Sequence, residues 1–166
     1  MEQQEQHAEQ RAERAQPVLQ LLQNERHGVL STLSDKLDGW PYGSLMPFAL
    51  TPQGEPLVLL STLAEHTQNV LNDPRVSLFV HDEAGTRENP QAAARATLIC
   101  LAEALAGKES VAAGERYLER FPQSARLFQM GDFKLFKLKV ERIRYIGGFG
   151  DMYWVSRNDF AAAGAQ

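Results

Sequence analysis

Apolar residues recur at alternate positions in several short segments of the chain, which is the pattern of half-buried β-strands. In residues 75–81 every second side chain is apolar, and residues 133–140 alternate apolar side chains with lysines. Turn residues separate most of these segments, so we expect an antiparallel sheet. Further strands are predicted over residues 28–33, 42–50, 57–61, 96–105 and 142–146.

Three other segments carry the three- and four-residue apolar spacing of helices, at residues 12–24, 62–71 and 108–120. Residues 1–10 are rich in Gln and Glu and are predicted to be a disordered tail, and the Ala-rich residues 157–166 a frayed one. Residues 11–156 are expected to form one domain. Many short strands with peripheral helices predict a mainly β protein, a small closed or nearly closed β-barrel.

Two local irregularities refine this prediction. Pro47 lies inside a predicted strand and cannot donate to a ladder, so that strand should lie at a sheet edge or carry a bulge. Leu135 and Phe136 are adjacent and both apolar, which breaks the alternation and predicts a β-bulge or a sharp barrel bend there.

Composition narrows the function classes. The net charge of −4 argues against non-specific nucleic-acid binding, because proteins that bind nucleic acid without sequence preference carry an excess of basic residues. The single cysteine, Cys100, lies in an apolar run and is expected to be a buried, inert thiol. The polar N-terminus and the lack of a long apolar run predict a cytoplasmic protein that binds no membrane. The four histidines lack paired ligand spacing, so no metal site is expected.

Polar side chains gather where the strand at 57–61 meets the following helix: Ser61, Thr62, His66, Thr67 and Asn69. The first turn of a helix offers unpaired N–H donors and partial positive charge, so this junction could hold a phosphate group. A purely structural alternative is that Thr62 and Glu65 form a capping box. The two interpretations are compatible. Arg95, at the start of an apolar strand, is either a surface residue or an anion partner that points into a pocket.

Six blocks carry a family resemblance: RHGVLSTLSD, GSLMPFAL, LVLLSTLAEHTQNVLNDPRVSLFV, AARATL, DFKLFKL and YIGGFGDMYWV. In this order they resemble the pyridoxamine 5′-phosphate oxidase-like FMN-binding split-barrel superfamily, closest to its haem-utilisation (HugZ/HutZ-type) branch. The resemblance implies a six-stranded antiparallel split barrel that forms a homodimer with two FMN sites between the subunits. It places Ser44, Leu45 and Met46 beside the flavin ring, the polar cluster at 61–69 at the phosphate, and Arg95 at the flavin of the partner subunit.

The chain departs from the family pattern at two points. His66 and Thr67 stand where the oxidase has an Arg–Lys pair, and no histidine follows His81, so a haem ligand near the C-terminus is absent. The leading hypothesis is an FMN-dependent oxidoreductase that acts on an unknown small molecule, with no catalytic residue assigned. The alternatives are a haem-binding or haem-degrading protein and a non-enzymatic barrel that has lost its cofactor.

Overall fold

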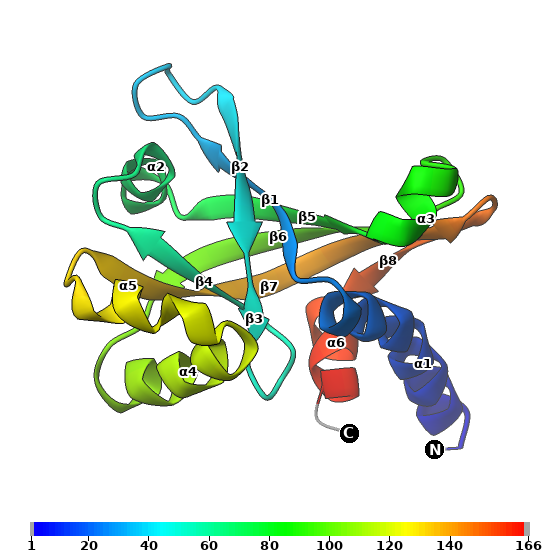
Figure 1. Cartoon of the computed structure of the whole chain (residues 1–166). Coiled ribbons are helices and arrows are strands. Elements are labelled where there is room, and N and C mark those ends of the chain that lie inside the picture. Colours follow the sequence, from blue (N-terminus) through cyan, green and yellow to red (C-terminus); the bar gives the residue numbers. More distant parts are fainter. Residues whose placement is uncertain (1, 165–166) are drawn as a thin grey trace.

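The computed structural model describes residues 2–164, with side chains from residue 10 onward. These residues form eight strands and six α-helices around one curled sheet (Figure 1). The strands are β1 His27–Leu33, β2 Pro41–Pro47, β3 Ala49–Leu50, β4 Pro56–Ser61, β5 Arg75–His81, β6 Arg95–Ala104, β7 Phe133–Gly148 and β8 Asp151–Ser156. The helices are α1 Glu2–Asn24, α2 Glu65–Asn72, α3 Glu83–Glu88, α4 Gly107–Arg120, α5 Ala125–Gln129 and α6 Arg157–Gly164, with a 3-10 turn at Pro122–Ser124.

The sheet closes because its two edge strands belong to one chain segment. The strand order is β2-β1-β5-β6-β7-β4-β3, β8 pairs with β7, and every pairing is antiparallel. Only the fully buried Phe48 separates β2 from β3. The chain bends at this residue and so connects the first and the last strand of the sheet. The predicted mainly β, antiparallel barrel is confirmed. The sequence predicted seven strand segments and the resemblance implied six strands, whereas the structure has eight. Residues 41–50 divide into two strands, residues 133–148 form one continuous strand, and β8 is added.

Two apolar clusters explain the irregular alternation in β4 and β7. Residues 57–60 of β4 are all buried, because one face of the strand lines the barrel interior and the other packs under α4. Leu135 and Phe136 of β7 are divided in the same way, with Phe136 inside the barrel and Leu135 beneath α4. The predicted bulge between them is therefore wrong. The register of β6 and β7 shifts instead at Ile99/Cys100, where β7 has the extra residue Glu141.

The two ends of the chain pack against each other. In Figure 1 the red α6 lies beside the blue α1, and Phe160 and Ala163 of α6 join the barrel core with Ala15 of α1. The prediction of a frayed tail is wrong for residues 157–164, because Phe160 is only 2% exposed and anchors the helix. The backbone is also helical from Glu2 onward, where disorder was predicted. Between residues 2 and 164 there is no helix long and apolar enough to cross a membrane.

Candidate functional site

The junction between β4 and α2 is built differently from the predicted capping box. Helix α2 begins at Glu65 after Ala64, and no side chain caps it. The Thr62 N–H donates to the Asp132 carbonyl over 2.7 Å, and the Thr62 carbonyl accepts from Gln68 Nε2 over 2.7 Å. The predicted capping box is therefore wrong, because Thr62 precedes the helix and its backbone groups bond to Asp132 and Gln68.

Two of the five predicted phosphate ligands point into the protein. The Thr67 hydroxyl donates to the Ser61 carbonyl over 2.5 Å, and Thr67 is buried. Asn69 is fully buried; its Oδ1 accepts from the Asp35 N–H, and its Nδ2 donates to Thr32 Oγ1, both over 2.9 Å. These groups are satisfied within the chain and hold α2 on the barrel, because a buried polar group without a partner is costly.

The remaining three members of the cluster stay at the surface. Ser61, Thr62 and His66 are partly exposed, and Ser61 Oγ accepts from the Leu63 N–H over 3.3 Å. Burial lowers the pKa of His66 below its usual value, so its imidazole is neutral near pH 7. The junction thus offers partly exposed hydroxyls and a neutral imidazole rather than a fixed positive charge.

The predicted flavin-side strand is an edge strand, as Pro47 indicated. Strand β2 is the outermost member of the sheet order. Leu45 points out of the barrel and is 72% exposed, Met46 points into the core, and Ser44 is half-buried. The edge is accessible, but only Leu45 presents a large side chain to solvent there.

Arg95 lies far from the predicted phosphate ligands at 61–69 within one chain. Its Nη1 donates to the carbonyls of Gln91 and Ala93 over 3.1 and 3.0 Å, so it clamps the loop before β6. Arg95 pairs with Ile146 of β7, whereas Ser61 pairs with Phe133 at the opposite end of the same strand. That separation is roughly 40 Å along the strand. One chain alone does not bring Arg95 to the 61–69 cluster.

A surface that the sequence analysis did not single out lies on the outer face of the sheet. Residues in register on β2, β1, β5, β6, β7 and β8 project from the same face, because side chains alternate along each strand. We call this the outer sheet face. It exposes several large apolar side chains, namely Val29, Leu45, Ile99, Leu101, Met152 and Trp154. The strand alternation already contained the signal, since apolar residues occupy both phases of these strands.

His81 stands at one end of the outer sheet face with its tautomer determined by its neighbours. Thr86 Oγ1 donates its only proton to the Asp82 carbonyl over 2.7 Å. The contact of 2.9 Å between Thr86 Oγ1 and His81 Nδ1 therefore requires the imidazole to donate. A proton held on Nδ1 in this way leaves Nε2 as the ring nitrogen that can ligate a metal, and among residues 10–164 Nε2 has no hydrogen-bond partner.

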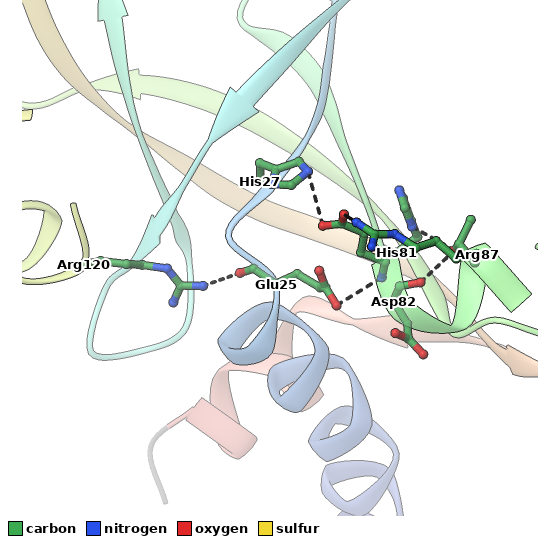
Figure 2. A network of polar contacts seen from close by, with 8 residues as sticks. Glu25, His27, His81, Asp82, Arg87 and Arg120 are labelled. Atoms are coloured by element: carbon green, nitrogen blue, oxygen red, sulfur yellow. Dashed lines mark hydrogen bonds and ion pairs between the residues drawn. The ribbon is translucent and has the colours of Figure 1, made fainter. Parts of the chain in front are cut away.

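A polar network fixes α3 beside this histidine (Figure 2). The Glu83 N–H donates to Glu25 Oε1 over 3.2 Å, and the Glu83 carboxylate pairs with Arg87 and lies 3.9 Å from His27 Nε2. His27 and His81 thus come from neighbouring strands to the same end of the sheet. The network holds the α3 turn in place and with it the Thr86 hydroxyl that orients His81.

The sequence matches a known family over nearly its whole length. The family described as CREG, beta-barrel, matches residues 6–162, nearly the whole chain. The chain belongs to the CREG β-barrel family. The matched residues include all eight strands and also His81 and Thr86.

Two curated relatives of this CREG β-barrel chain are haem enzymes by name. The non-canonical heme oxygenase HOZ of Arabidopsis thaliana chloroplasts is 32% identical over 143 residues, which cover 84% of this chain and 43% of that protein. The heme oxygenase HutZ of Vibrio cholerae is 28% identical over 152 residues, covering 88% of this chain and 84% of HutZ. The chain thus spans less than half the length of the Arabidopsis relative.

Solved structures agree with this placement. A heme binding protein from Mycobacterium smegmatis superposes with a TM-score of 0.82 at 31% identity, covering 92% of this chain and 60% of that one. A protein of the pyridoxinephosphate oxidase family from Clostridium acetobutylicum shares the fold, with a TM-score of 0.69, 90% of this chain and 98% of that chain covered, and 12% identity. The suspected superfamily and its haem-utilisation branch are therefore confirmed. The relatives named above favour the haem alternative over the leading FMN hypothesis.

Proposed function

We propose that this protein binds haem on the outer sheet face, with His81 as the axial ligand. The observation that carries the proposal is the imidazole of His81, whose Nδ1 lies 2.9 Å from the Thr86 hydroxyl and whose Nε2 has no hydrogen-bond partner in the part of the chain that the structure describes. A single neutral histidine suffices to hold haem iron, so the absence of a histidine near the C-terminus is no obstacle. The relatives that are named as haem oxygenases and as a heme binding protein support haem as the bound molecule.

The surroundings of His81 fit the remaining parts of a haem molecule. A porphyrin is flat and largely apolar, and the outer sheet face exposes Val29 and Leu45 beside the histidine end. The propionate groups need cations, and Arg142 and Arg144 project from the same face. Their guanidinium groups lie 5.8 and 5.6 Å from the ring centroid of Trp154, where stacking keeps them extended.

We further propose that the protein is a homodimer that uses part of this face. An isolated subunit leaves the apolar side chains of Leu45 and Trp154 72% and 53% exposed on this face. Exposed apolar patches mark interaction surfaces. A second subunit would cover such residues and could bring Arg95 of the partner to a groove that one chain cannot complete. The chain has a mass of 18.6 kDa, so light scattering should report about twice that value. A monomeric mass would overturn this part of the proposal.

FMN is the competing ligand, proposed on the fold alone. A flavin-dependent oxidoreductase would need the 61–69 junction to receive the phosphate. With the Thr67 hydroxyl and the Asn69 amide already bonded within the chain, the groups left for it are Ser61, Thr62 and His66. Titration of the protein with FMN, followed by quenching of flavin fluorescence, tests this alternative directly. A non-enzymatic barrel without a cofactor predicts that neither ligand binds.

The decisive experiment is a hemin titration followed by the Soret band. The unmodified protein should give a saturable, shifted Soret band, and His81→Ala should lose the axial-ligand signature in the absorption and resonance Raman spectra. His66→Ala is the matched control, because it removes an imidazole that lies outside the outer sheet face, and it should retain that signature. No Soret shift with the unmodified protein would refute haem binding. An axial-ligand signature that persists unchanged in His81→Ala would refute the assigned ligand.

A further inference from the structure

A separate cavity of about 710 Å³ lies between α1, α4, α6 and the hairpin that joins β3 to β4. Its volume falls within the roughly 300–1,000 Å³ typical of sites for small molecules. Leu19 of α1 and the residues Ala49 and Leu50 of β3 provide an apolar wall. None of the residues that line this cavity belongs to the outer sheet face or to the 61–69 junction.

Two arginines one turn apart on α4 line the same cavity. Arg116 Nε donates to the Leu50 carbonyl over 2.9 Å, which points the guanidinium along the cavity wall. Arg120 Nη2 donates to the carbonyl groups at the end of α1, those of Leu22 and Gln23 over 3.3 Å and that of Glu25. Figure 2 shows this last contact. Both side chains are thus held in place before any ligand arrives, which lowers the entropic cost of binding.

The positive charge of these arginines is not balanced within the chain. Among residues 10–164, no carboxylate lies within 4.0 Å of the guanidinium nitrogens of Arg116 or Arg120. In the same part of the chain, Arg120 Nε is buried and has no hydrogen-bond partner. Burial and the neighbouring Arg26 both lower the pKa of Arg120, which means that its charged form is destabilised as the site stands. A bound anion would offset the unbalanced charge of the two guanidinium groups.

One acidic side chain also lines the cavity. Glu119 is exposed to solvent and forms no ion pair with any cation among residues 10–164. Its carboxylate would repel an anion weakly, because exposed charges are screened. Glu119 therefore allows a test of the sign of the ligand's charge, because neutralising this carboxylate should strengthen the binding of an anion and weaken the binding of a cation.

We propose that this cavity binds a small organic carboxylate with an apolar body. The carboxylate would accept hydrogen bonds from Arg116 and from the free donors of Arg120, and the apolar body would lie against Leu19, Ala49 and Leu50. Planar, forked donors suit a carboxylate, and the apolar wall selects against fully hydrated inorganic ions. This is a second site, independent of the haem proposal.

The test uses octanoate as the probe, with acetate and inorganic phosphate as comparisons. The buried Arg120 Nε–H gives an NMR signal that reports the site directly, and calorimetry gives the affinity. Octanoate should shift this signal saturably, and acetate should bind at least about 10-fold more weakly because it lacks the apolar chain. A signal that octanoate leaves unmoved would overturn the proposal. Phosphate binding as tight as octanoate binding would overturn the assigned ligand class.

Variants separate the site from general effects of charge. Arg116→Gln should weaken octanoate binding about 10-fold, as expected for a lost charge-assisted hydrogen bond. Glu119→Gln should strengthen it about twofold. Arg126→Gln removes an exposed guanidinium of α5 outside the cavity and should change nothing. An affinity unaffected by Arg116→Gln, or weakened by Glu119→Gln, would refute the placement of the anion.

Discussion

Asn69 joins α2 to the barrel through two side-chain hydrogen bonds, one buried and one partly buried, and its replacement by alanine should destabilise the fold. The Asp35 N–H would lose its acceptor and the Thr32 hydroxyl its donor, both at 2.9 Å in the intact protein. A buried hydrogen bond contributes about 1 kcal/mol, and a buried donor left without a partner costs about 1–3 kcal/mol. Together these terms predict that Asn69→Ala lowers the free energy of unfolding by about 2–4 kcal/mol.

Urea denaturation followed by tryptophan fluorescence measures this loss, because Trp40 lies beside the loop that Asn69 anchors. With a slope of about 2 kcal/mol per molar urea, the midpoint should fall by about 1–2 M. Thr32→Val should cost about 1 kcal/mol by itself. The double variant should cost less than the sum of the two, because both single changes break the same Asn69–Thr32 bond.

The matched control is Gln68→Ala, which removes an exposed amide from the same helix. It should change the free energy of unfolding by less than about 0.5 kcal/mol. An Asn69→Ala protein as stable as Gln68→Ala would refute the reasoning. If Asn69 served a cofactor phosphate instead, its loss would reduce ligand affinity and leave the stability of the ligand-free protein nearly unchanged.

Three further predictions concern other parts of the molecule. Burial raises the pKa of the Cys100 thiol, so the native protein should resist a thiol reagent at pH 8 and react on unfolding. Arg75 holds the pKa of Asp73 at about 2, so the stabilisation from this pair is present above pH 4 and lost as the pH falls toward 2. Arg75→Gln should raise this pKa, measured by NMR, toward its ordinary value but not fully to it, because the backbone N–H of residue 75 still donates to Asp73. Gly28→Ala would place a Cβ 2.5 Å from a backbone carbonyl of β5 and should destabilise by about 1–3 kcal/mol, whereas Gly43→Ala meets only an ordinary contact at 3.4 Å and should be neutral.

The strands were largely predictable because their signal is local. The period-2 alternation of residues 75–81 led to the bounds that β5 has in the structure, and Pro47 correctly indicated an edge strand. The same signal failed where a strand serves two cores. Leu135 and Phe136 resembled a bulge in the sequence, but each is buried on its own side of β7. Nothing local reveals that α4 covers the second side.

The candidate sites were less predictable, because residue type does not tell which way a polar side chain points. Thr67 and Asn69 suited a phosphate by chemistry, yet α2 packs on β1 and turns both inward. His81 resembled any other histidine until α3 placed the Thr86 hydroxyl against its Nδ1. In each case the partner, not the residue, decided the role.

The sequence by itself determined the antiparallel barrel, its edge at Pro47 and the family to which the chain belongs, because alternation and ordered motifs are written along the chain. Only the tertiary structure decided which polar groups remain free to bind a ligand. Hydrogen bonds join residues distant in sequence, as Asn69 to Asp35 and Arg120 to Leu22 show, and a donor already satisfied within the fold cannot serve a cofactor.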